Sequence, residues 1–504
     1  MNPARRSFAM RWWPVLLLLG VSVAVRLAVW VRLPDLHGGR SGTTIELYKE
    51  ALRHHLWEYL FYEHTEPIGL SLVHAFLLRV FGDAGFSNAV MVVPAMLNGV
   101  ICVLLIYAIA RRLDAHPLIA WPICAVFSIA LIPFEVWWYG WTLDHYTMVL
   151  VALFAWALVN RTLDPRPRYD VLTAIAGGLL LMIQKVASLV VPVMIVATAW
   201  LLRASNGSRI QRTAITLIGP LLIAAVLIGK NAIASGVYAT SNLAGPNVAV
   251  FLYAANGYDF DRVYHFAERA GAPDWYRWCF QRAHALQPAW GPAYGACYLS
   301  DDETSGPYNF EPLQRYLAGH GEARLAQVVA SDDRRFSERP YLRPLVLETG
   351  SRLADEYGKI SQHLYRTFLW KEPLAFLKQI VRSHYIYLVD GWRFFLSRMK
   401  ERPWMPYAGL LLLASGLCFF ILMQAYVATF LLGARLLLMR WRRGAGAFGE
   451  ADRGVLVLIL GVLVLSGVFS LVCCENGRWF LQCTPYLLPL LACFLQEVLL
   501  RGSA

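Results

Sequence analysis

The chain has 504 residues, of which 57% are hydrophobic and 16% are charged, and its mean hydropathy is +0.45. A soluble globular protein of this length is less apolar, so the composition indicates a polytopic membrane protein. The net charge of +12 favours a nucleic-acid partner only if the basic residues cluster on a soluble domain. The nine cysteines include no Cys-x-x-Cys pair, which argues against a thioredoxin-like or zinc-ribbon site.

The apolar runs predict an all-α membrane protein with about ten transmembrane helices, within a range of roughly nine to thirteen, because a hydrocarbon core of about 30 Å needs about 20 apolar residues per helix. In chain order, the predicted spans are residues 12–32, 87–110, 117–134, 143–160, 169–183, 186–203, 212–232, 405–437, 454–474 and 481–500.

The first predicted span is followed by a polar loop, residues 33–86. Residues 33–67 of this loop carry Asp35, Glu46, Glu50, Glu58, Glu63 and Glu66. Tethered to apolar segments at both ends, these carboxylates are expected at the membrane surface, where a lipid-borne substrate presents its head group. The apolar stretch 68–82 is too short to span and contains His74 and Arg79, so we expect a helix lying in the interface.

The connections rich in arginine are predicted to face the cytoplasm, together with both termini. They are the turn after residue 110, the connections 161–170, 203–212 and 435–453, and the two chain ends. Their charges account for the net +12, so a nucleic-acid partner loses its support.

Three parts of the chain follow from this topology. Residues 1–232 form an N-terminal transmembrane module with the catalytic outward loop 33–86, and residues 405–504 form a C-terminal module. Residues 233–404 form a large outward insertion, whose aromatic and charged clusters predict short helices resting on the membrane and a small soluble domain. Cys279 and Cys297 lie in this insertion, where a disulfide and two free thiols are both compatible with the sequence.

Polar side chains also stand at the predicted outer ends of later spans, namely Asp144, Lys185 and Arg478. Each alone is explained by capping or snorkelling at the interface. Together with the first loop they place carboxylates and cations on one face of the bundle. Cations suit a phosphate, and a carboxylate suits a proton, as a reaction on an anionic lipid requires.

The order of short motifs resembles the GT-C superfamily of polyprenyl-phosphate-sugar-dependent membrane glycosyltransferases. The likeness is closest to the branch of aminoarabinose transferases and protein O-mannosyltransferases. It rests on Glu46, Tyr48 and Ala51, then His64-Thr65-Glu66-Pro67, LLRVFG and YAIARRL, then Pro133 with Asp144, Asn231, Gly236, Ser241, Gly245 and Asn247, and Arg478 with Pro485 and Pro489. The likeness covers most of residues 10–255 and 454–500, but not the insertion.

This resemblance implies transfer of a sugar from a polyprenyl-phosphate donor to a lipid, glycan or protein acceptor on the outer face of a bacterial inner membrane. The family's paired Asp-Glu is replaced here by Ile45-Glu46, so either Glu46 or Asp35 is the expected base. Asp144 is the expected second carboxylate. Tyr48, His64, Lys185 and Arg478 are expected to bind substrate, the two cations through the donor phosphate.

We expect no cofactor and no metal, although some GT-C enzymes use a divalent metal. Two other functions are compatible with parts of this pattern. A polysaccharide polymerase or ligase uses a similar lipid-linked donor and shares the large outward loops. A transporter is disfavoured because the halves of the chain differ and the charges gather at the outer ends rather than mid-membrane.

Overall fold

The structure is a computed structural model of the chain. It describes residues 3–32, 42–63, 67–132, 144–164, 166–184, 186–202, 206–240, 244–256, 259–286, 311–342, 345, 352–385, 408–443, 448–472 and 482–501. Every described element of secondary structure is a helix. The predicted all-α fold is therefore confirmed.

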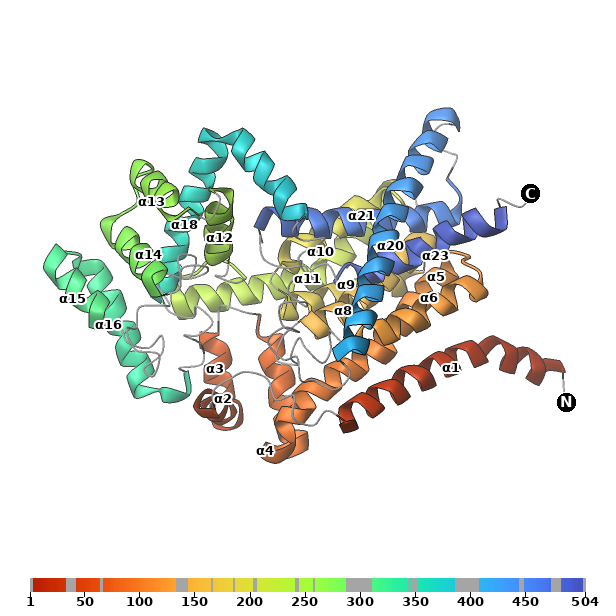
Figure 1. Cartoon of the computed structure of the whole chain (residues 1–504), viewed down its shortest axis with the longest axis horizontal. Helices are drawn as coiled ribbons and strands as arrows, with labels where there is room; N and C mark the ends of the chain where they lie inside the picture. The colour runs from red at the N-terminus through yellow and green to blue at the C-terminus, as the bar shows by residue number, and fades with distance from the viewer. Residues whose placement is uncertain are drawn as a thin grey trace.

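The apolar helices lie side by side along the long axis of the molecule, and only α20 crosses them steeply (Figure 1). Five described helices are long and apolar enough to cross a membrane, and shorter apolar helices accompany them. Each predicted span coincides with helices of this bundle, which confirms a polytopic membrane protein. The bundle consists of α1 (Pro3–Arg32), α4 (Gly69–Leu97), η1 (Asn98–Cys102), α5 (Val103–Arg112), α6 (Pro117–Ala130), α8 (Asp144–Leu163), α9 (Pro167–Ile183), α10 (Ala187–Ala199), α11 (Asn206–Ser235), α20 (Ala408–Arg443), α21 (Glu450–Val472) and α23 (Thr484–Arg501).

Small residues let neighbouring helices of the bundle approach closely. A Cβ atom added at Gly178 of α9 would lie 2.7 Å from the side chain of Ile223 in α11. One added at Gly219 of α11 would lie 3.1 Å from the carbonyl oxygen of Ala174. In a membrane, where lipid is as apolar as the side chains, such close packing is a main source of helix association.

The two ends of the bundle differ in character. At the end that we call the arginine end, α1 begins, α5 finishes in Arg111 and Arg112, and α23 ends (Figure 1). Here the buried carboxylate of Asp170 accepts hydrogen bonds from Arg161 at 3.0 Å and Arg212 at 2.8 Å, tying α8, α9 and α11 together. The other end, which we call the insertion end, carries the first polar loop and the helices of the insertion.

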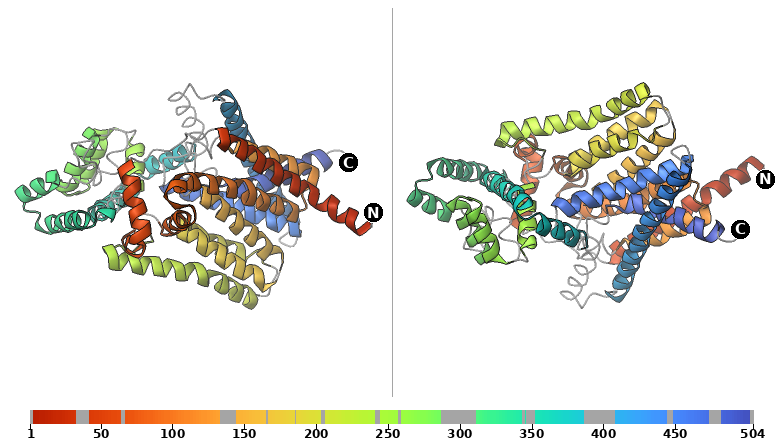
Figure 2. Two further views of the ribbon diagram at one scale, coloured as in Figure 1. Left: turned by 90° about the horizontal axis from the view of Figure 1, so that it is seen from below. Right: turned by 90° about the horizontal axis from the view of Figure 1, so that it is seen from above.

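The first polar loop folds into helices that lie across the insertion end. They are α2 (Gly42–His54), α3 (Leu56–Tyr62) and the first half of α4 (Figures 1 and 2). Within α4 the backbone breaks at Gly82, whose φ of 65° and ψ of −177° are readily adopted only by glycine. The predicted boundary of a short helix at residue 82 therefore coincides with a real kink. Beyond it the chain turns into the bundle.

The insertion contributes α12 (Ala244–Ala255), α13 (Phe260–Arg269), α14 (Asp274–Leu286), α15 (Glu311–His320), α16 (Ala323–Glu338), η4 (Pro340–Leu342), α18 (Arg352–Lys371) and a helix over 373–385. The predicted short helices are therefore present, and their place on the membrane stays a prediction. They share one apolar core with the first loop, in which Tyr48 and Phe86 are buried together with Phe251 and Leu342. Cys279 is buried in α14, and Cys297 lies outside the described residues, so their pairing stays untested.

Candidate functional site

A buried polar cluster stands at the insertion end, where α2, α3, α4 and α11 meet (Figure 2). We call it the Glu63 cluster, and its members are Tyr48, Glu63, Ser71, His74 and Lys230. Tyr48 and Glu63 are 4% and 3% exposed, and Ser71 and His74 are each 2% exposed. Polar groups are buried this thoroughly only when they are hydrogen-bonded to one another, so the cluster acts as a unit.

A chain of hydrogen bonds links three helices in this cluster. The Ser71 hydroxyl of α4 donates to Oε1 of Glu63, directly after α3, at 2.8 Å. The Tyr48 hydroxyl of α2 lies 3.3 Å from the Ser71 hydroxyl and 3.0 Å from Nδ1 of His74. Ser71 and His74 are three residues apart on one helix and therefore face the same side.

Aromatic rings enclose the same groups. The His74 ring is held edge-on between Tyr48 and Phe86, at centroid distances of 5.9 and 6.1 Å. Tyr48 also packs edge-on against Tyr59 of α3 at 5.6 Å. This apolar wall keeps water away from the hydrogen bonds and so strengthens them.

Lys230 enters the cluster from α11, far along the chain. Its ammonium donates to the carbonyl oxygens of Leu60, at 3.0 Å, and of Glu63. The last carbonyls of a helix have no partner within the helix, so this lysine satisfies the C-terminal end of α3. Its charge also offsets that of the buried Glu63 carboxylate.

A second polar group lies deeper in the bundle, around the π-helix η1. Asn98 Nδ2 lies 3.0 Å from Nδ1 of His145 at the start of α8. The fully buried Arg26 of α1 donates to Ser128 Oγ at 3.1 Å and to the carbonyl of Ala95 at 3.0 Å. Gly99 makes room for the guanidinium, because a Cβ atom there would lie 2.2 Å from it. A π-bulge of this kind reorients side chains within a helix and is frequent at functional sites.

The structure describes three of the predicted site residues. Tyr48 belongs to the Glu63 cluster. Glu46, two residues earlier on α2, has a side chain that is 70% exposed and pairs with Lys49 at 2.9 Å. Asp144 is the first residue of α8, directly before the buried His145, and only its place in the helix is described.

The other predicted site residues, Asp35, His64, Lys185 and Arg478, lie outside the described residues. The described residues nearest to Lys185 and Arg478 lie together at the insertion end. Gln184 Nε2 lies 3.3 Å from Oε1 of Gln482, which joins the end of α9 to the start of α23. A Cβ atom at Gly69 would lie 2.4 Å from the carbonyl oxygen of Met182, so α4 begins against the same end of α9.

Neither Glu63 nor Lys230 is among the site residues that the sequence predicts. The signal for Lys230 was present, since an ionisable side chain inside an apolar span usually faces protein and has a partner. The predicted Asn231 motif has a structural role in the described part of the chain. Asn231 Nδ2 donates to the carbonyl of Ala239 at 2.8 Å, and Gly236 takes a φ of 76° in the turn after α11.

Within the described ranges, no group of three or more His, Cys, Asp or Glu side chains is placed to hold a metal ion. An Asp-x-Asp sequence, Asp259-Phe260-Asp261, stands at the start of α13. Helix capping explains it, because Asp259 Oδ1 accepts the backbone N–H of Arg262 at 3.2 Å.

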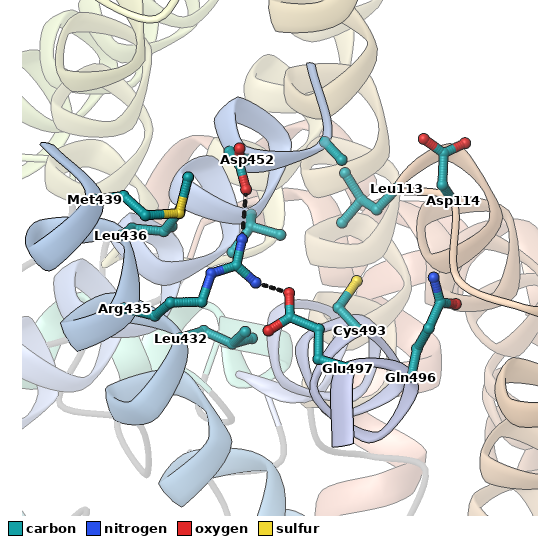
Figure 3. A pocket seen from close by; sticks show the side chains of 12 residues that line it. Leu113, Asp114, Leu432, Arg435, Leu436, Met439, Asp452, Cys493, Gln496 and Glu497 are labelled. Carbon is teal, nitrogen blue, oxygen red and sulfur yellow. Dashed lines mark hydrogen bonds and ion pairs between the residues drawn. The ribbon is translucent and has the colours of Figure 1, made fainter. Parts of the chain in front are cut away.

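A cavity of about 570 Å³ lies at the arginine end, away from the Glu63 cluster. Figure 3 shows Arg435 at its centre, between the carboxylates of Asp452, at 2.9 Å, and Glu497. This bridge ties α20 to α21 and α23. We take it as a structural link rather than the reaction site, because its carboxylates, Asp114, Asp452 and Glu497, outnumber the single Arg435 and would repel an anionic donor.

Comparison with known proteins supports a membrane glycosyltransferase of the GT-C type, the class that the sequence motifs resemble. Residues 65–231 match the family described as dolichyl-phosphate-mannose-protein mannosyltransferase, which is of this type. The matched segment includes Ser71, His74 and Lys230 of the Glu63 cluster. No curated protein and no solved structure matches the chain.

Proposed function

We propose that the protein transfers a sugar from a polyprenyl-phosphate-linked donor to a lipid, glycan or protein acceptor at the insertion end, which faces outward from a bacterial inner membrane. The single observation that carries this proposal is the family match over residues 65–231. That segment begins in the first loop and ends in the last turns of α11, and it includes three members of the Glu63 cluster.

The chemistry needs few groups. A sugar on polyprenyl phosphate already has a good leaving group, so the enzyme must deprotonate an acceptor hydroxyl and stabilise charge on the departing phosphate. We assign the base to Asp35 in preference to Glu46, because Glu46 is exposed and paired with Lys49. Asp144 serves as the second carboxylate that orients the acceptor.

Binding of the donor is assigned to residues around the meeting point of α4, α9 and α23. Lys185 follows Gln184, and Arg478 precedes Gln482, the two glutamines that lie together. Two cations there suit a phosphate group, Arg478 through a planar fork that can bind it with two hydrogen bonds. His64, the next residue in the sequence after Glu63, is assigned to the donor as well, and Tyr48 of the Glu63 cluster orients α2.

The test of the base compares purified Asp35→Asn, Glu46→Gln and Asp144→Asn in a transfer assay with a synthetic polyprenyl-phosphate sugar. Asp35→Asn should lose roughly a hundred- to ten-thousandfold, as is typical for removal of a general base. Glu46→Gln should stay within a few-fold of the parent. Glu50→Gln, a second exposed carboxylate on α2, is the matched control. Rates near the parent's in all three variants would refute this active site.

The donor class is tested by deleting the gene and identifying the accumulated lipid by mass spectrometry. A polyprenyl monophosphate with a single sugar, the unused donor, is the lipid expected to accumulate. A pyrophosphate-linked oligosaccharide would instead identify a polymerase or ligase.

A further inference from the structure

The helix over 373–385 exposes more large apolar side chains than it buries. Its side chains Phe376, Gln379 and Ser383 are buried against the protein, although two of the three are polar. Leu374 and Val381 on the opposite side are 82% and 65% exposed. A helix packed on a water-soluble domain shows the reverse pattern, with apolar residues inside and polar residues outside.

The exposed apolar residues form one continuous stripe. Leu374, Leu377, Val381 and Tyr385 follow one another at steps of three or four residues, which places them on the same helix face. Trp370, at the end of α18 just before this helix, is exposed as well. We call these five side chains the apolar stripe.

The polar side of the helix is anchored to the bundle. Nδ1 of His384 lies 2.9 Å from the Ser470 hydroxyl near the end of α21, and Nε2 lies 2.5 Å from the Tyr426 hydroxyl of α20. Val427 and Phe430, which flank Tyr426, are exposed on the outside of the bundle. The apolar stripe is therefore attached beside a surface that an apolar bundle turns toward lipid.

Basic side chains border the same exposed face. Lys371, Lys378 and Arg382 are exposed along it, and Glu372 is the single exposed acid between residues 370 and 385. Lysine and arginine beside an apolar face characterise helices that lie in a membrane interface, where the bases contact anionic head groups.

We propose that the apolar stripe lies in the membrane surface at the insertion end and binds lipids with anionic head groups. The occupant is lipid rather than a protein partner, because the stripe continues the lipid-facing surface beside Tyr426 and carries a basic border. The helix would thereby hold the insertion at a fixed height above the bilayer. This inference does not depend on the reaction that the enzyme catalyses.

The test uses the full-length protein in nanodiscs that contain phosphatidylcholine with a photoactivatable diazirine on its acyl chain. After irradiation, mass spectrometry of peptides should find label on the segment 370–385 at a level comparable with Leu221 and Leu222, which are exposed on α11. α16, an amphipathic helix of the insertion, serves as the control and should carry several-fold less label. Equal labelling of the segment 370–385 and α16 would overturn the proposal.

The head-group preference is tested by adding phosphatidylglycerol to the nanodiscs. When the phosphatidylglycerol rather than the phosphatidylcholine carries the diazirine, label on the segment 370–385 relative to label on α11 should rise, and the Lys371→Glu/Lys378→Glu variant should abolish the rise. Labelling that is independent of phosphatidylglycerol in the parent would overturn the anionic part of the proposal. Protection of the stripe by a second copy or another protein, seen as loss of lipid label with a shift to a larger particle, would overturn all of it.

Discussion

One ammonium group, that of Lys230, supports two backbone carbonyls and a buried carboxylate. Buried charges are costly when they lose their partner, and breaking such a pair commonly destabilises a protein more than the pair itself stabilises it. Lys230 therefore contributes to the stability of α3 as well as to the electrostatics of the site.

We expect Lys230→Met to lower the free energy of unfolding by roughly 2 kcal/mol, because the end of α3 loses two charge-assisted hydrogen bonds and the buried Glu63 side chain loses a nearby cation. Thermal unfolding in nanodiscs measures the change. Lys49→Met is the control, since it breaks an exposed pair with Glu46 and should cost about 1 kcal/mol or less. Adding Glu63→Gln to Lys230→Met should restore part of the loss. A lysine variant as stable as the parent would show that the ammonium does not support the cluster.

A pH-dependent contribution comes from Asp332 in α16. Burial raises the pKa of this fully buried carboxyl to about 6, while Arg335 opposes the shift, from 3.8 in the unfolded chain. Between pH 4 and pH 6 the unfolded carboxyl has lost its proton while the folded one keeps it. The folded state binds more protons, so the free energy of unfolding falls as the pH rises through this window.

Asp332→Asn should therefore be more stable than the parent at pH 7, by an amount on the order of 3 kcal/mol. The asparagine oxygen can still accept the backbone N–H of Leu353, which Asp332 accepts at 3.2 Å. Unfolding midpoints measured from pH 4 to pH 7 should lose their slope in this variant. Asp333→Asn, which changes the adjacent carboxylate, should keep the parent's slope. An unchanged slope in Asp332→Asn would exclude this carboxyl as the source.

Among the elements, α3 is held on two sides. Its Glu58 accepts the Tyr341 hydroxyl at 2.6 Å and pairs with Arg339 at 2.9 Å, both from the stretch around η4 of the insertion. Arg339 also donates to the Tyr62 hydroxyl at 3.1 Å. The C-terminal end of α3 leads into the Glu63 cluster. The insertion therefore touches the short helix that leads to the candidate site.

We expect Glu58→Ala to loosen α3 and lower kcat several-fold while leaving KM for the donor nearly unchanged. The pair is partly exposed, so its loss should cost about 1 kcal/mol or less of global stability. Hydrogen exchange of the amides from 59 to 63 should accelerate, which a purely electrostatic effect on the reaction would not produce. Glu338→Ala, an exposed acid on the nearby α16, is the matched control. Unchanged exchange in Glu58→Ala would contradict a positioning role for this contact.

Element positions were largely predictable, because the thickness of a bilayer fixes how many apolar residues a span needs. The buried side of α2 was harder to predict from the sequence. Its buried side is set by Tyr48, Ala51 and Leu52. With the phase set by Tyr48, Glu46 turns outward, since two residues on a helix rotate the side chain by about 200°. Tyrosine, amphipathic itself, does not show from sequence which way it faces.

At the scale of the whole molecule, the helices alternate between the two ends as the arginine-rich connections predicted (Figure 1). The assembly of the site was not predictable in the same way. Lys230 and Glu63 are 167 positions apart, and the two glutamines beside Lys185 and Arg478 are 298 apart. Such pairings depend on how the helices pack, whereas hydropathy reports only each segment by itself.

The orientation of the whole molecule is tested by fused reporters. Fusions after Thr65 and after Asp83 should both report the outer compartment, because the first half of α4 lies across the insertion end and enters the bundle only after the kink at Gly82. A fusion after Asp114 should report the cytoplasm, as arginines at a span end favour that side. A cytoplasmic signal at Asp83 would contradict this topology.

The space that Gly99 leaves for the guanidinium of Arg26 joins two positions that are far apart in the sequence. A larger residue at position 99 is compatible with this packing only if position 26 shortens at the same time. In an alignment of relatives the two columns should therefore change together, glycine appearing where arginine appears. Such covariation would identify more distant relatives that keep this buried cation even where hydropathy profiles have diverged.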